Sequence, residues 1–169
     1  AKLENKQRHF DMREARIEDV LAEVGAIMAH KLEQERFHLT THAAAVPAFA
    51  FDRDVLIQVL INVIENSLKF GRNSPRKEIS ITAALDGAMV HIAVTDSGPG
   101  IPSHLLRKVF DDFYRVDNDL TRTTGGTGIG LALVDKLMTA MGGRVAAANN
   151  TGVGCTISLY LPAAPLQAG

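Results

Sequence analysis

The sequence has little of what marks secreted, metal-binding or membrane proteins. Its one cysteine, Cys155, can form no disulfide within the chain, and no set of Cys and His residues has metal-ligand spacing. No apolar run reaches the roughly 18 to 20 residues that cross a bilayer, and the polar start AKLENKQRHF is unlike a signal peptide. We therefore expect a cytoplasmic domain that does not insert into a membrane. Any inner-membrane anchor of the full-length protein would lie outside this chain.

The chain also lacks an excess of charge of either sign. Lys and Arg total 18 and Asp and Glu total 19, so the net charge of -1 creates no field that would attract a polyanion. Nucleic acid is therefore not an expected partner. The composition is 46% hydrophobic and 22% charged over 169 residues, which is typical of one globular domain with a single core. We expect one domain over residues 1–169 that is monomeric in isolation.

Apolar periodicity and turn signals predict a mixture of helices and strands. Helices are expected where apolar residues recur every three or four positions, and strands where apolar and polar residues alternate. The predicted helices are 17–31, 52–70 and 128–141, the predicted strands are 78–85, 89–96, 144–149 and 155–161, and 36–51 should hold a strand, a loop and a second short strand. Asp52 should cap the second helix, Gly71 should end it, and Asp86-Gly87 should turn a hairpin.

Residues 97–126 form a long connection with one short apolar-periodic piece, 103–110. Connections of this length are usually functional lids or disordered segments. Helices that are grouped apart from a run of hairpin-linked strands indicate an α+β fold. The expected architecture is a two-layer α/β sandwich, with helices on one face of a mixed, mostly antiparallel sheet.

The predicted helix 52–70 is mostly apolar, so its polar positions carry information. Gln58, Asn62, Glu65, Asn66 and Lys69 are three or four residues apart and form one polar stripe. The two asparagines can offer amide oxygens to a hard cation such as Mg²⁺, and the lysine can reach a phosphate. Taken alone, the stripe is better explained as the solvent face of an amphipathic helix, because such faces are common.

Asp96 is the more informative carboxylate. It ends an alternating strand, and the alternation places it on the same, buried face as the apolar residues before it. A buried carboxylate needs a hydrogen-bond donor, and an adenine amino group is one candidate. Gly98 and Gly100 would let the backbone turn sharply and approach a flat ring closely. The alternative is a turn carboxylate that caps its own loop, since Asp-Ser-Gly is a frequent turn sequence.

A glycine-rich run, 126–130, opens the third predicted helix. Free amides at a helix start can bind phosphate oxygens, where the helix dipole also favours negative charge. The run lacks the Lys-Ser/Thr ending of a P-loop, and it follows a long connection where a dinucleotide-binding motif would follow a strand. Both of those nucleotide folds are therefore disfavoured.

Five segments, taken in order, resemble the sequence boxes of the histidine kinase catalytic domain. Residues 62–70 resemble its N box, 96–101 its first glycine box, 110–115 its F box, 126–131 its second glycine box and 152–154 its last. The resemblance covers about residues 13–162. It implies the Bergerat ATP-binding fold, with ATP and Mg²⁺ as ligands and residues 97–126 as the ATP lid.

The resemblance also implies roles for single residues. Asn66, with Asn62, would hold Mg²⁺, Lys69 would contact phosphate, and Asp96 would accept a hydrogen bond from the adenine amino group. The other implied nucleotide contacts are Phe70, Gly98, Gly100, Ile101, Arg115, Arg122, Gly126, Thr127, Gly128, Ile129, Gly130, Leu131 and Cys155. Phe110 and Phe113 would anchor the lid or dock on a partner helix.

For some of these residues, an interpretation without a functional role explains the sequence about as well. Glu65, Asn66 and Lys69 are the implied catalytic residues, and Glu65 occupies the position of an acidic residue suspected of helping the phosphoryl acceptor lose its proton. An exposed helix carboxylate with no such role is about as good an interpretation of Glu65. Arg115 and Arg122 are candidate contacts of the γ-phosphate, or else solvated arginines of the lid.

The sequence departs from the family pattern at two points. None of its six histidines is followed by Glu or Asp and then closely by Pro, as the phosphate-accepting histidine of the family is. The chain alone should therefore bind ATP and not phosphorylate itself. Cys155 stands where the family usually has a Ser or Thr hydroxyl near the adenine-binding aspartate. A thiol is a weak hydrogen-bonding group, so the surroundings of Asp96 should be looser or rely on water.

The implied function is transfer of the γ-phosphoryl group of ATP to a histidine on a separate dimerisation domain, with relay to a response regulator. One alternative is a superfamily ATPase like gyrase or MutL, but those enzymes carry a general-base Glu where this chain has Asn62, which cannot take a proton from water. Another is a nucleotide-binding module without kinase activity. A domain that had lost kinase activity is disfavoured, because the chain keeps Asn66, Lys69, Asp96 and the glycines of the boxes.

Overall fold

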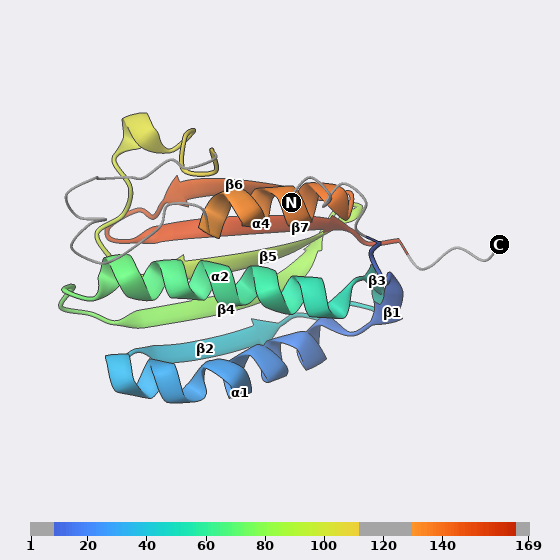
Figure 1. The fold of residues 1–169 in the computed structure, drawn as a ribbon, viewed down its shortest axis with the longest axis horizontal. Coiled ribbons are helices and arrows are strands. Elements are labelled where there is room, and N and C mark those ends of the chain that lie inside the picture. Colours follow the sequence, from blue (N-terminus) through green and yellow to red (C-terminus); the bar gives the residue numbers. More distant parts are fainter. Residues whose placement is uncertain (1–8, 112–129, 165–169) are drawn as a thin grey trace.

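The structure is a computed structural model that describes residues 9–111 and 130–164 (Figure 1). In chain order, the elements within these ranges are β1 (Arg13–Ala15), α1 (Ile17–Glu35), β2 (His38–Ala43), β3 (Phe49–Phe51), α2 (Arg53–Gly71), β4 (Glu78–Asp86), β5 (Met89–Asp96), a 3-10 turn (Ser103–Leu105), α4 (Gly130–Ala140), β6 (Arg144–Asn149) and β7 (Cys155–Pro162).

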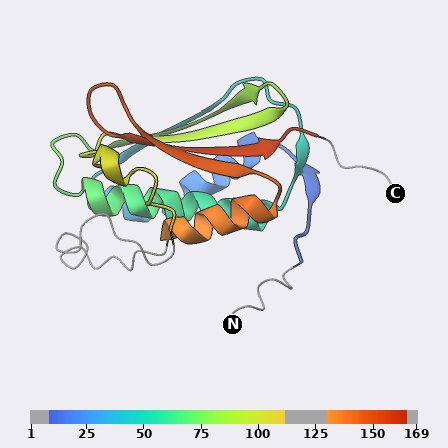
Figure 2. The ribbon, with the colours of Figure 1, turned by 90° about the horizontal axis from the view of Figure 1, so that it is seen from above.

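The main sheet has the strand order β2-β4-β5-β7-β6. The β2–β4 pair is parallel and the other neighbouring pairs are antiparallel. Helices α1, α2 and α4 lie together on one face of this sheet, which is clearest when the molecule is seen from above (Figure 2). The predicted α+β sandwich with a mixed, mostly antiparallel sheet is therefore confirmed.

The core fills the space between the two layers. In β5, Val90, Ile92 and Val94 alternate with half-buried residues and face the helices, as a period of two requires. Helix α2 occupies the middle of the helical layer, where it contacts α1, α4 and β5. The central helix and the central strand therefore share the most buried region of the molecule.

Both predicted ends of α2 are confirmed. Asp52 precedes the helix, and its Oδ1 accepts a hydrogen bond from the backbone N–H of Val55 at 3.2 Å, which is the geometry of an N-cap. Oδ2 of the same carboxylate accepts from the backbone N–H of Asp11 at 2.8 Å, so the cap also holds the segment that leads into β1. Gly71 is the last residue of the helix.

Four details differ from the sequence prediction. Helix α1 continues to Glu35 because Leu32 is still buried, and it ends at Arg36, whose φ of 65° is left-handed. Ile27, on the predicted buried face of this helix, is 50% exposed. The periodic piece 103–110 contains only a 3-10 turn, and β1, which pairs with β3 in a separate two-stranded sheet, was not predicted.

Helix α4 begins at Gly130 among the described residues, so the predicted start at 128 lies outside them. The helix ends close to the predicted place, and Gly142 follows with a φ of 86°. Across the described ranges, no helix has both the length and the apolar character needed to cross a membrane.

Candidate functional site

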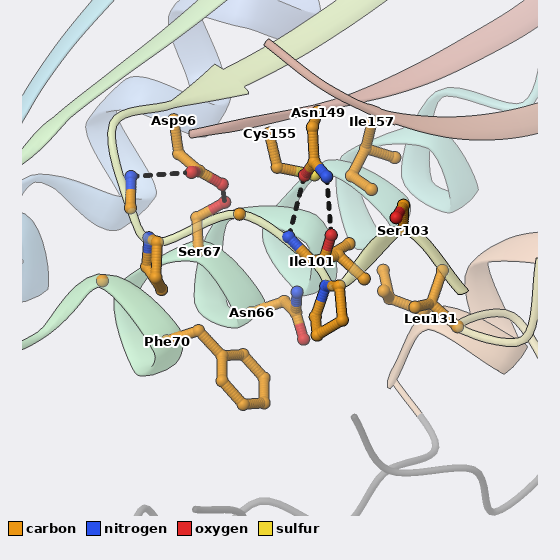
Figure 3. A pocket seen from close by; sticks show the side chains of 16 residues that line it. Asn66, Ser67, Phe70, Asp96, Ile101, Ser103, Leu131, Asn149, Cys155 and Ile157 are labelled. Atoms are coloured by element: carbon orange, nitrogen blue, oxygen red, sulfur yellow. Dashed lines mark hydrogen bonds between the residues drawn. The ribbon is translucent and has the colours of Figure 1, made fainter. Parts of the chain in front are cut away.

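A cavity of about 520 Å³ opens between the C-terminal half of α2, the loop that follows β5 and the start of β7 (Figure 3). The described residues that line it are Asn66, Ser67, Phe70, Gly71, Asp96, Gly98, Pro99, Gly100, Ile101, Pro102, Ser103, Val109, Leu131, Asn149, Cys155 and Ile157. The volume lies within the usual range for small-molecule sites. The cavity therefore joins residues from the N box and the first glycine box, which are about 30 positions apart in the sequence.

Asp96 lines this cavity from the end of β5. Its Oδ2 accepts a hydrogen bond from the hydroxyl of Ser67 at 3.0 Å, and its Oδ1 accepts from the backbone N–H of Gly98 at 2.9 Å. Burial raises the pKa of the Asp96 carboxyl, while the hydrogen bonds from Gly98 and Ser67 oppose that rise. The result is a partly desolvated carboxylate with a fixed orientation, which is well suited to accept a hydrogen bond from a ligand.

Cys155 is opposite Asp96 in the β5–β7 register and lines the same cavity. Only 5% of it is exposed. Burial, followed by the nearby charge of Asp96, raises the pKa of the Cys155 thiol to about 12. The thiol is therefore neutral at physiological pH, and it contributes a small, weakly polar surface beside the carboxylate.

Glycines allow the backbone to pass closely around Asp96. Gly100 has a φ of 83° and Gly154 has a φ of 95°, which are left-handed values that favour glycine. A Cβ at Gly154 would also overlap the main-chain oxygen of Asp96. The first and last glycine boxes therefore pack against each other at the end of β5.

The structure divides the polar stripe of α2. Asn66 and Phe70 line the cavity, whereas Asn62, Glu65 and Lys69 do not line it within the described part of the chain. Asn62 accepts a hydrogen bond from the side chain of Gln58 at 2.7 Å, and Glu65 forms an ion pair with Lys31 of α1 at 3.5 Å. Asn66 is thus the member of the stripe that a ligand in the cavity would meet.

Several predicted site residues lie outside the described residues, namely Phe113, Arg115, Arg122, Gly126, Thr127, Gly128 and Ile129. Gly130 begins α4, and the next residue, Leu131, is buried and lines the cavity. Ile101 lines it from the glycine loop, and Phe110 packs against the core. The described site residues therefore line one cavity, apart from Asn62, Glu65, Lys69 and Gly130.

Sequence reasoning missed three polar residues that line the cavity, Ser67, Ser103 and Asn149. Ser67 is only 4% exposed, and its position directly after Asn66 in an apolar helix is the one signal that could have identified it. Asn149 ends β6, and its side chain makes two hydrogen bonds to the main chain of Ile101, 48 residues away in sequence. No local pattern predicts a contact over that separation.

The described residues contain no group of three or more His, Cys, Asp or Glu side chains that could hold a metal ion. The oxygen donor that the α2 stripe contributes to the cavity lining is instead the neutral amide of Asn66. This donor set fits Mg²⁺, which uses few protein ligands when nucleotide phosphates and water complete its shell.

Comparisons with known proteins agree with this geometry. Residues 51–165 match the family model described as histidine kinase-, DNA gyrase B-, and HSP90-like ATPase. The sensor histidine kinase WalK of Bacillus subtilis is 42% identical over 111 residues, which are 66% of this chain and 18% of that protein. The chain therefore spans about a fifth of the length of this relative.

Two solved structures show the same fold. The full-length kinase ShkA in complex with AMPPNP matches with a TM-score of 0.79 and 28% identity, over 95% of this chain and 33% of that one. The nucleotide-free catalytic domain of the histidine kinase ThkA matches with a TM-score of 0.78 and 24% identity, over 92% of this chain and 100% of that one.

Proposed function

The chain belongs to the family of histidine kinase-, DNA gyrase B- and HSP90-like ATPases and is an ATP-binding catalytic domain of the histidine kinase type, and we propose that it binds Mg²⁺-ATP and transfers the γ-phosphoryl group to a histidine on a separate dimerisation domain. The observation that carries this proposal is the oriented carboxylate of Asp96, which lines a cavity of about 520 Å³. The AMPPNP complex of ShkA supports a nucleotide as the ligand.

The part of the cavity beside Asp96 suits adenine. Asp96 has both oxygens directed by donors of the protein, yet each oxygen keeps a lone pair for the adenine amino group. Ile101, Leu131 and Ile157 give the cavity apolar walls that can pack against a flat ring. Gly98 and Gly100 bring the backbone close without side chains that would occupy the ring's place.

The polar residues of α2 suit the phosphates. Asn66, and Asn62 one turn before it, would hold Mg²⁺ by their amide oxygens, and Lys69 would neutralise phosphate charge. Bound Mg²⁺ would supply charge neutralisation and orientation of the phosphates. The Asn62 oxygen accepts a hydrogen bond from Gln58 and keeps its second lone pair for a cation.

Residues outside the described ranges, together with Gly130 at the start of α4, would complete the proposed site. Gly126, Gly128 and Gly130 would bind the phosphates through backbone amides, with Thr127 and Ile129 between them. Arg115 or Arg122 would contact the γ-phosphate. We place all of this in one domain, with a core over about residues 13–162 and an ATP lid over about 97–126.

The acceptor and the onward partner come from the proposed chemistry. The γ-phosphoryl group would pass to a ring nitrogen of histidine, ADP would leave, and Glu65 would help the ring lose its proton. The histidine would lie on the dimerisation domain of the same full-length kinase, and a response regulator would receive the phosphoryl group next. A relative with the name sensor histidine kinase supports this assignment.

Hydrolysis of ATP without an acceptor is less well supported. Such activity needs a general base for water, and Asn62 stands at the position where the ATPases of this superfamily carry it. Asn62 is an amide and does not line the cavity in the described part of the chain. Phosphoryl transfer to a histidine therefore fits the site better than hydrolysis.

Calorimetric titration with AMPPNP tests the nucleotide site directly. We expect binding by the native chain, loss of binding in Asp96→Ala, and binding that no longer responds to Mg²⁺ in Asn66→Ala. Transfer is then tested by adding the histidine-bearing domain of the same protein as a separate polypeptide with labelled ATP. A folded native chain that does not bind AMPPNP would contradict the proposal, as would binding without any transfer.

A further inference from the structure

Two consecutive asparagines at the end of β6 hold both ends of the glycine loop, residues 96–101. The Oδ1 of Asn149 accepts a hydrogen bond from the backbone N–H of Ile101 at 2.8 Å, and its Nδ2 donates to the carbonyl oxygen of Ile101 at 2.6 Å (Figure 3). The Nδ2 of Asn150 donates to the main-chain oxygen of Asp96 at 3.2 Å. The loop that forms one wall of the cavity is thus fixed at its first and last residues.

The clamp on Ile101 requires an amide side chain. A carboxamide presents one acceptor and one donor side by side, which matches the N–H and C=O of a single residue. A carboxylate offers only acceptors and a hydroxyl is too short to reach both groups. The same packing explains Gly100, because a Cβ there would lie 2.9 Å from the Oδ1 of Asn149.

We propose that Asn149 is a positioning residue for the nucleotide, which holds the glycine loop in its binding conformation before the nucleotide arrives. The inference rests on the proposed function and adds a residue to it. Ordering a loop during binding lowers affinity, so a loop that is already ordered binds more tightly. Two hydrogen bonds of ordinary net strength correspond to roughly 5- to 150-fold in affinity.

The location of the clamp predicts a distinctive pattern of effects. The loop begins at Asp96, the proposed partner of the adenine amino group, and its residues line the cavity up to Ile101. Loss of the clamp should therefore weaken every adenine nucleotide by the same factor, with or without Mg²⁺. A general loss of stability would instead lower the melting temperature and leave the affinity of the folded chain unchanged.

The test compares Asn149→Ala with Asn73→Ala, which changes an exposed asparagine in the turn after α2. ADP and AMPPNP are titrated into each protein by calorimetry, with and without Mg²⁺, well below the melting temperature. We expect about a tenfold loss of affinity for Asn149→Ala that is equal for both nucleotides, and native affinity for Asn73→Ala. Native affinity in the folded Asn149→Ala protein, or a loss that depends on Mg²⁺, would overturn the inference.

Hydrogen exchange separates the clamp from the nucleotide site. The backbone amide of Ile101 should be protected in the nucleotide-free native chain and exchange quickly in Asn149→Ala. If the native chain binds no nucleotide, the proposed function fails, while protection of Ile101 still reports on the clamp. Should Asn149→Ala not fold, Asn149→Asp keeps the acceptor and removes the donor, and the inference requires it to lose affinity in the same way.

Discussion

The hydroxyl of Ser67 donates a hydrogen bond to Oδ2 of Asp96 across 3.0 Å, and this contact joins α2 to the end of β5. Gly98 donates to the other oxygen, so the carboxylate is held from the helix on one side and from its own loop on the other. Cys155 cannot supply a strong hydrogen bond at this place, because its thiol is a weak donor. Ser67 therefore provides the hydroxyl that orients the carboxylate.

Removal of the Ser67 hydroxyl should weaken nucleotide binding. In Ser67→Ala the buried Asp96 loses a charge-assisted hydrogen bond, which contributes about 1.5–3 kcal/mol in typical cases, so its pKa should rise further and its side chain should become freer to rotate. We expect affinity for AMPPNP to fall by up to roughly 10- to 150-fold, measured by calorimetry. The control is Ser158→Ala, which removes a hydroxyl that bonds to His91. Equal affinities in the two variants would contradict the role of Ser67.

Asp96→Asn should raise stability while it removes nucleotide binding. The pKa of Asp96 is raised by burial, so its ionised form is disfavoured in the folded chain. The stability contributed by its protonated form is fully present below the ordinary pKa of 3.8 and is lost as the pH rises through the raised pKa. At pH 7 the variant without nucleotide should therefore melt at a higher temperature than the native chain.

The pH dependence provides the check on Asp96. The difference in melting temperature between Asp96→Asn and the native chain should shrink as the pH falls through the raised pKa. Melting can be followed by circular dichroism, since the chain has no tryptophan. A native chain that is more stable than the variant at pH 7 would show that the hydrogen bonds outweigh burial.

Cys155 should be almost inert to thiol reagents in the folded chain. A rise in the pKa from 9.0 to about 12 lowers the thiolate fraction by about a thousandfold, and the residue is also buried. Alkylation by iodoacetamide at pH 8 should therefore proceed only when the cavity opens, and AMPPNP should slow it further. Because Cys155 is the only cysteine, mass spectrometry reads the reaction without background. Labelling as fast as in urea would contradict this environment.

The parts of the fold that were predicted are those with local causes. The ends of α2 follow from the Asp52 cap and from Gly71, and the hairpin follows from Gly87, whose φ is 63°. Strand β1 was missed because it has three residues and its partner β3 lies more than 30 positions later, so neither length nor periodicity reveals it.

The site shows the same division. Residues with a local sequence signal were predicted, and residues that act through long-range contacts were missed. The alternation of β5 placed Asp96 on the buried face, and the structure confirms that it faces α2. Ser67 and Asn149 act through contacts 29 and 48 residues away, which a sequence pattern does not encode. The sequence identified the polar positions of α2, but which of them line the cavity depends on the position of the cavity in the folded chain.

Two neighbouring glycines allow the clash at Asp96 to be measured separately. Gly154 and Gly152 have similar φ values, 95° and 97°, but only Gly154 has the main-chain oxygen of Asp96 where a Cβ would go. Gly152→Ala should cost about 1 kcal/mol of unfolding free energy, and Gly154→Ala at least about 2 kcal/mol more. Urea unfolding gives both values. Similar losses in the two variants would mean that the main chain at Asp96 moves away from the added Cβ with no measurable loss of unfolding free energy.

Glu65 should affect phosphoryl transfer without affecting nucleotide affinity. It does not line the cavity among the described residues, and its partner Lys31 comes from α1, so its replacement should leave the contacts of a nucleotide in the cavity intact. Glu65→Gln should leave the affinity for AMPPNP unchanged and slow transfer to the histidine-bearing domain by at least about a hundredfold, as loss of a general base does.

Lys31→Ala separates this role from simple loss of the ion pair. The two side chains are 47% and 44% exposed, so the pair should contribute less than about 1 kcal/mol to stability. The lysine variant keeps the carboxylate and should keep most of the transfer rate, with the pH profile of transfer showing whether a carboxylate still titrates. If Lys31→Ala and Glu65→Gln slow transfer equally, the ion pair itself matters and Glu65 is not the base.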